Sequence, residues 1–277
     1  GQGTWDTANA TYQGESFNAS AQLSEPDAVE FNPDGTKMFI TDTVLATVFA
    51  YNLSVPFGVS SAVYNSESFN VSSQETASNF AKFNPNGTRL YVGGPATDAI
   101  YEYALTTGFD VSSASYTGTS FSVSAYGDGP NDIAFSPDGT KLFIDFFSNN
   151  FYAFDLGTPW DLNSAIYNGE TINLSGGGIQ DFKLSPDGKY LFVLRFNDDI
   201  VRTYELSTLF DISTASFVSD SPAVSSQEGS PFGFDMSSDG TKMFIIGAGA
   251  ETVFAYDLPA TIATSTGANA LGSVSFN

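Results

Sequence analysis

A short turn motif occurs five times along the chain, and this repeat limits the possible folds more than any other feature. The five copies end in a glycine and span Phe31–Gly35, Phe83–Gly87, Phe135–Gly139, Leu184–Gly188 and Met236–Gly240. Successive glycines lie 52, 52, 49 and 52 residues apart. The Pro-Asp-Gly core suits a tight turn, because proline fixes φ and glycine adopts positive φ at little cost. A regular period of this length predicts a repeat architecture.

Apolar segments surround each turn at constant distances. One follows the turn directly, as in Lys37–Ile40 and Lys141–Ile144, and a second ends in leucine, as in Val48–Leu53. A serine-rich segment such as Ser68–Ser72 precedes the next turn. These segments are short and rich in β-branched and aromatic residues, which is typical of strands. No stretch keeps a helical period over 11 or more residues, so the chain is predicted to be all-β.

Four strands in each repeat predict a β-propeller. An outermost strand is expected at 14–20, followed by five three-stranded units near 28–53, 80–105, 132–156, 181–206 and 233–258. The opening strand should pair with the last unit, because this closes the ring and removes free sheet edges. We therefore predict one five-bladed domain of four-stranded antiparallel blades over residues 1–258, with 259–277 as a tail or linker. The terminal Ser273–Asn277 resembles an outer strand and is a rival candidate for closure.

The composition excludes several kinds of chemistry. The chain has no Cys and no His, so thiol nucleophiles, cysteine-ligated metals and histidine-based catalysis are ruled out. It carries 31 Asp and Glu against 9 Lys and Arg, a formal net charge of −22. Such a surface should repel nucleic acid and anionic membranes. No apolar run is long enough for a membrane helix, so membrane insertion is not expected.

The Ser-Pro-Asp-Gly-Thr-Lys-Leu-Phe stretch at Ser136–Phe143, with Thr97–Tyr103 in the preceding repeat, resembles the YVTN and lactonase-like propeller superfamily. The resemblance extends over nearly the whole chain and implies a propeller. This superfamily includes surface-layer proteins, phage and cell-surface modules, sugar-lactone enzymes and binding rings. Its members more often have six or seven blades than five. No catalytic motif can be transferred to this sequence residue by residue.

Polar residues are predicted where the innermost strands begin, at the mouth of the central channel. The candidate ligand-binding residues are Asp27, Asn79, Asn131, Asp132, Gln180, Asp181, Phe146 and Phe147. Their amide and acid oxygens could bind a polyol or a hard cation such as Ca²⁺, and the Phe146–Phe147 pair is expected to be exposed for a sugar or protein contact. The alternative is that the polar groups bond to neighbouring loops and hold the blade tops together.

Acidic residues are also concentrated in the loops on the same face. They are Glu25, Asp42, Glu75, Asp98, Asp128, Asp145, Asp198, Asp199, Glu228 and Glu251. The face should therefore be strongly negative and could collect Ca²⁺, although no cofactor is required by the sequence. The alternative is that these carboxylates are solvated loop tips, because no calcium-loop spacing is present.

Taken together, these features predict a non-enzymatic extracellular module, such as a surface-layer unit, a virion appendage or an adhesin. It would contact a protein or glycan on a surface, or assemble with itself or with a larger structure. One alternative is a carbohydrate-binding propeller lectin. Another is a lactonase- or glycosidase-like enzyme that uses Ca²⁺ or paired carboxylates; for glycoside hydrolysis the candidate pair is Asp132 and Asp181 on adjacent blades. No residue is assigned as catalytic in the preferred interpretation.

Overall fold

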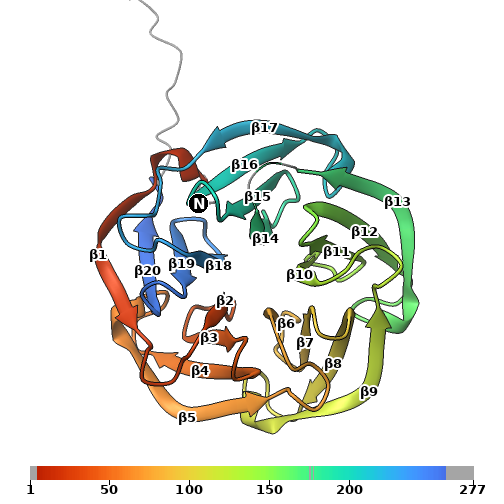
Figure 1. The fold of residues 1–277 in the computed structure, drawn as a ribbon, viewed down its shortest axis with the longest axis horizontal. Helices are drawn as coiled ribbons and strands as arrows, with labels where there is room; N and C mark the ends of the chain where they lie inside the picture. Colours follow the sequence, from red (N-terminus) through yellow and green to blue (C-terminus); the bar gives the residue numbers. More distant parts are fainter. Residues whose placement is uncertain (1–4, 175, 177, 260–277) are drawn as a thin grey trace, which may run out of the picture.

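The computed structural model describes residues 5–174, 176 and 178–259, which form five four-stranded antiparallel sheets around one axis (Figure 1). Blade 1 comprises β2 (Pro26–Phe31), β3 (Lys37–Asp42), β4 (Thr47–Leu53) and β5 (Ala62–Asn70). Blade 2 comprises β6 (Phe80–Phe83), β7 (Arg89–Gly94), β8 (Ala99–Leu105) and β9 (Ala114–Ser122). Blade 3 comprises β10 (Pro130–Phe135), β11 (Lys141–Phe146), β12 (Asn150–Leu156) and β13 (Ala165–Asn173).

Blade 4 comprises β14 (Ile179–Leu184), β15 (Tyr190–Arg195), β16 (Ile200–Leu206) and β17 (Ala215–Asp220). Blade 5 joins β18 (Pro231–Met236), β19 (Lys242–Gly247) and β20 (Thr252–Asp257) to β1 (Thr11–Asn18). The helices of the described part are five three-residue 3₁₀ turns, η1 (Thr7–Asn9), η2 (Val59–Ser61), η3 (Val111–Ser113), η4 (Leu162–Ser164) and η5 (Ile212–Thr214). None of these is long or apolar enough to span a bilayer.

The two ends of the described chain close the ring. Strand β1 pairs antiparallel with β20, with Thr11 opposite Asp257 and Asn18 opposite Thr252, and Figure 1 shows it as the outermost strand beside β20. The predicted five-bladed fold and its closure by the N-terminal strand are therefore confirmed. The rival segment Ser273–Asn277 lies outside the described residues.

Aromatic side chains fill the spaces between adjacent blades. Phe39 of blade 1 packs on Phe83 of blade 2, with ring centroids 4.4 Å apart. Tyr91 of blade 2 contacts Phe135 of blade 3 at 4.7 Å. Because β-strands alternate their side chains, one face of each blade supplies rings to each neighbour. The core is thus divided into inter-blade layers around the axis.

A second aromatic feature fixes the turn that joins the first two strands of a blade. In blades 1 to 4, the backbone N–H of one aromatic residue donates to the carbonyl of the turn glycine at 2.9–3.0 Å. These residues have φ between 57° and 66° and are Phe57, Phe109, Trp160 and Phe210. Each ring lies directly over the glycine. Glycine is therefore needed at the turn both for its positive φ and for the absence of a Cβ.

We expect Gly139→Ala to lower the free energy of unfolding by about 2–4 kcal/mol, because a Cβ at φ +71° would collide with the Trp160 ring. The matched control is Gly229→Ala, since Gly229 has open space around its Cβ position. Thermal unfolding followed by circular dichroism measures both variants. Equal melting temperatures for the two would contradict this account of the turn.

Candidate functional site

A bulge at the start of the innermost strands directs side chains toward the channel mouth. The pairing register shifts after the first residue of β2, β10, β14 and β18. The residues that fall in these shifts are Asp27, Asn131, Gln180 and Phe232. Bulges commonly re-aim a side chain in this way. In blade 2 the corresponding residue is Asn79, whose backbone N–H bonds to the Gly93 carbonyl at 2.9 Å.

Asn131 connects three blades. Its Nδ2 donates to the Ile179 and Gln180 carbonyls of blade 4, at 2.8 Å each. Its Oδ1 accepts a hydrogen bond of 3.3 Å from Asn79 Nδ2. Only 2% of Asn131 is exposed. For Asn131, the alternative role of holding the blade tops together is the one the structure shows.

Four of the loop carboxylates are buried and bind backbone amides. Asp42, Glu75, Asp145 and Glu228 are all fully buried. Asp42 Oδ2 accepts from the backbone N–H groups of Ser24 and Glu25, at 2.6 and 2.7 Å. The expectation of solvated loop tips is therefore wrong for these four residues, because the loops need acceptors for their buried N–H groups. Among the described residues no group of three or more acids is arranged to hold a metal ion, and calcium binding stays a prediction.

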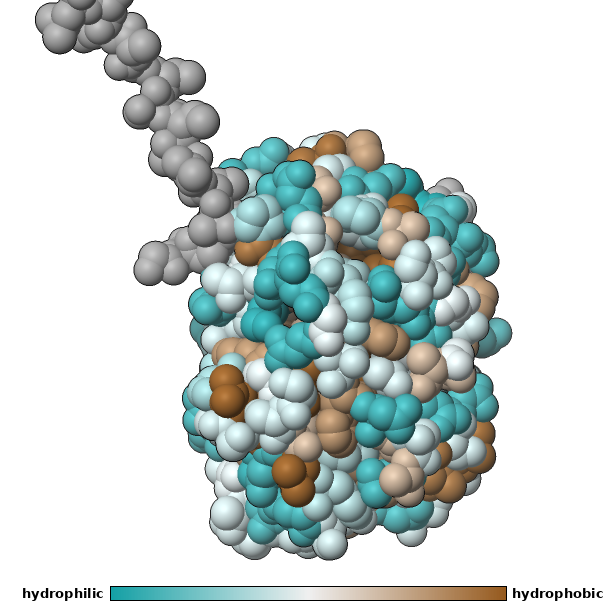
Figure 2. All heavy atoms as spheres, turned by 90° about the vertical axis from the view of Figure 1, so that its left-hand side faces the viewer, coloured by the Kyte–Doolittle hydropathy of each residue, from teal (hydrophilic) through white to brown (hydrophobic). Residues whose placement is uncertain are grey.

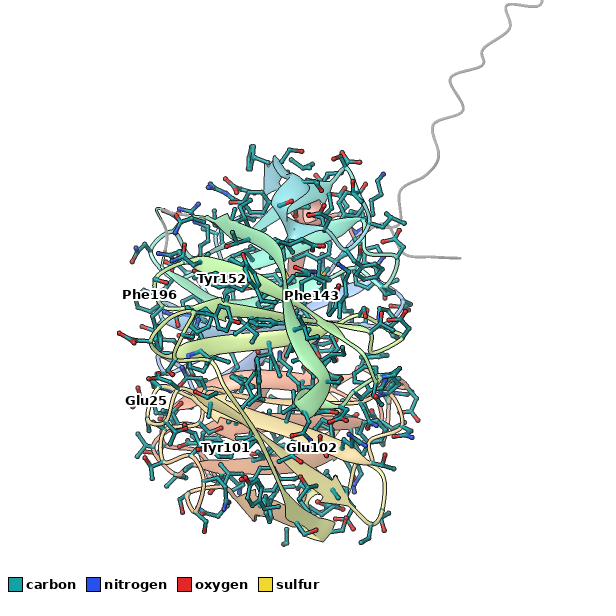
Figure 3. The ribbon with its side chains drawn as sticks, turned by 90° about the vertical axis from the view of Figure 1, so that its right-hand side faces the viewer. Glu25, Tyr101, Glu102, Phe143, Tyr152 and Phe196 are labelled. Carbon is teal, nitrogen blue, oxygen red and sulfur yellow. The ribbon has the colours of Figure 1, made fainter. Side chains whose placement is uncertain are left out.

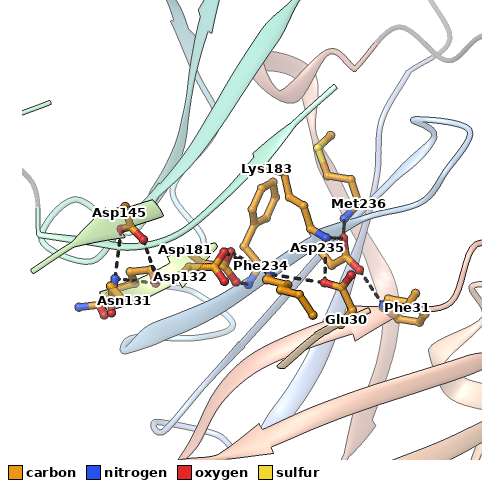
Figure 4. Close-up of polar contacts among 12 residues, drawn as sticks. Glu30, Phe31, Asn131, Asp132, Asp145, Asp181, Lys183, Phe234, Asp235 and Met236 are labelled. Atoms are coloured by element: carbon orange, nitrogen blue, oxygen red, sulfur yellow. Dashed lines mark hydrogen bonds and ion pairs between the residues drawn. The ribbon is translucent and has the colours of Figure 1, made fainter. Parts of the chain in front are cut away.

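The channel below the mouth is filled by a charged network (Figure 4). Lys82 Nζ lies 3.1 Å from Asp132 Oδ2, 3.4 Å from Glu30 Oε2 and 3.8 Å from Asp181 Oδ1. Lys183 Nζ lies 2.9 Å from Glu30 and 2.8 Å from Asp235. The innermost strands of all blades but blade 3 supply a charged side chain at the level of Lys82, where blade 3 has Ala134. We refer to Glu30, Lys82, Asp132, Asp181, Lys183 and Asp235 as the channel network.

Burial and charge compensation set the protonation of this network. Burial raises the pKa of Asp181 well above its usual range, and the nearby Asp132 raises it further. Burial also raises the pKa of Asp235 to about 6, although Lys183 offsets part of the effect. Burial lowers the pKa of Lys82, but the carboxylates around it outweigh this and hold the pKa well above its ordinary value. The two ammonium groups therefore stay charged, whereas burial favours the protonated form of Asp181.

Asp132 and Asp181 lie together, as the paired-carboxylate hypothesis requires, but both face the network. Each is only 2% exposed. Asp132 Oδ1 and Asp181 Oδ1 have no hydrogen-bond partner in the described part of the chain. Their common neighbour is the Lys82 ammonium group rather than an open cavity. This position gives a substrate no direct access to them.

Above the network, the mouth contains a cavity of about 260 Å³. We call it the mouth cavity, and its lining residues are Glu25, Asp27, Thr43, Asn79, Pro95, Phe147, Gln180 and Phe232. Asp27 Oδ2 accepts a hydrogen bond of 3.1 Å from Thr43 Oγ1. The Phe232 ring stacks on Phe196, with centroids 5.4 Å apart. Figure 3 shows Glu25 and Phe196 at the same end of the ring.

The predicted site residues fall into two groups, one that lines the mouth cavity and one that lies beneath it, and the prediction for one residue is wrong. Asp27, Asn79, Gln180 and Phe147 line the mouth cavity, whereas Asn131, Asp132 and Asp181 lie beneath it. The prediction of an exposed Phe146 is wrong, because Phe146 is fully buried and packs on Tyr152 at 5.7 Å. It is still paired within β11, opposite Pro130, so it points into the core. Phe147 follows the strand and is 48% exposed.

Sequence reasoning missed the lower level of the channel network. Glu30, Lys82, Lys183 and Asp235 each lie two positions beyond the upper level of their strand. Their positions in the sequence could have indicated this, because alternate residues of a strand face the same side, and these four lie two residues after positions already expected to face the channel. A smaller hollow of about 160 Å³ opens at the opposite end of the channel, between Lys183, Phe135 and Trp160 among others. Its two lysines are already paired with carboxylates.

Comparisons with known proteins support the fold. No protein-family model and no curated protein matches the chain. Among solved structures, a proposed 6-phosphogluconolactonase from Bacteroides uniformis ATCC 8492 is 18% identical, with a TM-score of 0.50 over 83% of this chain and 65% of that one. A protein from Lactobacillus plantarum is 14% identical, with a TM-score of 0.50 over 84% and 67%. Sqt1 from Chaetomium thermophilum is 18% identical, with a TM-score of 0.45 over 84% and 58%.

This chain therefore spans between 58% and 67% of the length of those three proteins. The resemblance to lactonase-like propellers is confirmed at the level of the fold. At these identities the similarity carries no information on activity.

We expect Lys82→Met to destabilise the protein by about 3–5 kcal/mol at pH 8, because it leaves buried carboxylates without their ammonium partner. The pKa values of these carboxylates would rise further in the folded state. The folded protein would then bind more protons than the unfolded chain, so the loss should shrink as the pH falls to 5.

Urea unfolding at both pH values measures this effect. Lys189→Met is the control, because the Lys189–Glu205 pair is 43% and 46% exposed, and it should behave like the wild type. A loss for Lys82→Met that is small, or that does not change between pH 5 and pH 8, would contradict the proposed charge balance.

Proposed function

We propose that this propeller is a non-enzymatic binding module that takes a small polyhydroxylated ligand, such as a sugar residue of a surface glycan, in the mouth cavity. The observation that carries the proposal is the combination of an exposed aromatic ring, Phe147, with polar side chains that keep unused hydrogen-bonding atoms. Asp27, Asn79 and Gln180 line the same cavity. Ligand sites commonly combine apolar walls with a few such polar groups.

The polar groups of the mouth cavity have free capacity for hydrogen bonds. In the described part of the chain, the side chains of Glu25 and Gln180 make no hydrogen bond or ion pair, and Asp27 uses only Oδ2. These groups can accept from and donate to ligand hydroxyls. The Phe147 and Phe232 rings can cover the apolar C–H face of a sugar ring. A free, concave set of this kind supports binding better than a purely structural role.

Several observations support binding without catalysis. The chain has neither His nor Cys. The adjacent-blade carboxyl groups of Asp132 and Asp181 are enclosed, and both lie beside the Lys82 ammonium group. The mouth cavity carries Glu25 and Asp27 as its carboxylates. A binding role requires no pair of catalytic carboxylates, and the polar and aromatic residues of the mouth cavity are sufficient for it.

We also propose that the protein is extracellular or exposed on the surface of a cell or a virion. The net charge of −22 favours solubility and disfavours contact with anionic polymers. On the side of the ring around β1, apolar side chains are scattered among hydrophilic ones (Figure 2). This wall shows no broad apolar patch, and the proposal places the contact for a glycan or protein partner at the mouth instead.

A glycan array followed by titration calorimetry tests the proposal. Phe147→Ala should weaken binding of the retained sugar by about tenfold, the effect of losing one aromatic contact, without lowering the melting temperature. Phe217→Ala is the matched control, because Phe217 is 58% exposed on β17, far from the channel.

The absence of any bound sugar, or equal affinities for the two variants, would contradict a site at the mouth. Turnover of a sugar lactone or glycoside that Asp132→Asn abolishes would contradict the non-enzymatic part of the proposal.

A further inference from the structure

We propose that the group which the mouth cavity selects in its ligand is a primary ammonium, carried by an amino sugar or by a lysine side chain. This inference rests on the proposed function, because it concerns the same cavity. It goes further by naming the charge and the donor groups of the ligand.

The cavity presents mainly hydrogen-bond acceptors. Glu25 and Asp27 contribute carboxyl groups, and the Thr43 hydroxyl lies 3.1 Å from both Asp27 Oδ2 and the Ser78 carbonyl, so its one hydrogen is already engaged. Asn79 uses its Nδ2 to bond Asn131, so its carbonyl oxygen is the part that remains. The side-chain donor left over among the lining residues is the Gln180 amide. A primary ammonium supplies three donors and no acceptor, which complements this set.

The charges around the cavity have one sign. No Lys or Arg is among its lining residues. The groups that face Asp27 are Glu25 in the loop before β2, Asp42 at the end of β3 and Asp132 on β10. The nearest cation of the channel, Lys82, is engaged by the network beneath. A cation would therefore be attracted by the carboxyl groups that line and adjoin the cavity, and an anionic ligand would be repelled.

Burial, followed by these carboxylates, raises the pKa of Asp27 to about 7, with the Thr43 hydrogen bond acting in the opposite direction. A ligand cation beside Asp27 would favour its ionised form. Binding of a cation should therefore strengthen as the pH rises through 7, whereas binding of a neutral sugar should not.

The aromatic rings add a second attraction for a cation. Phe147 is 48% exposed at the cavity, and the Phe232 ring is supported from behind by Phe196. The faces of such rings attract ammonium groups. Carboxylates and aromatic faces thus line the same 260 Å³ cavity, which is of a size for one sugar ring or one side-chain tip.

Titration of the wild-type protein at pH 7 with glucosamine and with glucose provides the first test, because the two sugars differ in one ammonium group and Asp27 is partly ionised at this pH. We expect glucosamine to bind at least about tenfold more tightly. Nα-acetyl-lysine methylamide, compared with its Nε-acetylated form, provides the second pair. Competition between glucosamine and the lysine probe shows whether they share the site, and the tighter of the two identifies the source of the ammonium.

The pH dependence is measured with the lysine probe, whose amine stays charged up to about pH 10. Its affinity should rise between pH 6 and pH 8 and should fall when salt is added. Asp27→Asn should abolish the rise and lower the affinity at pH 8. Asp128→Asn is the control, because Asp128 is an exposed acid in the loop before β10 and does not line the cavity.

The outcomes separate the two proposals. If glucose and other neutral sugars bind at the mouth as tightly as their amino forms, the ammonium inference is wrong and the proposed function stands. If neither class binds, the proposed function fails and the inference fails with it. A pH dependence that persists in Asp27→Asn would overturn the assignment of the ammonium to Asp27.

Discussion

The ion pairs of the channel network, on the axis of the ring, are the central interaction of this structure. Five innermost strands converge there, and the side chains of Lys82, Asp132, Asp181 and Asp235 are almost fully buried. Lys82 and Lys183 lie between Glu30, Asp235 and the Asp132–Asp181 pair. Buried charges of one sign would be too costly without these partners. The network therefore joins the innermost strands across the axis and lies between the mouth cavity and the smaller hollow at the opposite end.

The outer parts of the fold keep this axis in position. Pairing of β1 with β20 places the N-terminal strand in blade 5, and the chain runs on from β1 into blade 1, which closes the ring. Aromatic layers between blades fix their spacing, and the rings over the turn glycines fix the end of each blade opposite the mouth. The buried loop carboxylates and Asn131 do the same at the mouth itself. A rigid rim of this kind pre-organises the few side chains that remain free.

The repeat made the fold predictable, because turn chemistry, strand composition and spacing all indicated the same four-stranded unit. The mouth residues Asp27, Asn79 and Gln180 followed from their positions at the strand starts. The prediction that Phe146 is exposed was wrong because one step along a strand reverses the direction of a side chain. Its burial therefore depends on where β11 ends. Lys82 and Asp132 lie 50 residues apart in neighbouring blades. That contact, like the partners of the loop carboxylates, depends on three-dimensional neighbours that no local pattern specifies.

The proposed binding role depends on a mouth that is rich in hydrogen-bond acceptors and lies above the buried ion pairs of the channel. The most direct measurement of this account is a crystal structure of the protein soaked with glucosamine. The account predicts ligand density bounded by Phe147, Phe232 and Asp27, with the Lys82–Asp132 contact intact below it. Density on the channel axis that displaces Lys82, or density confined to the opposite end beside Trp160, would contradict it.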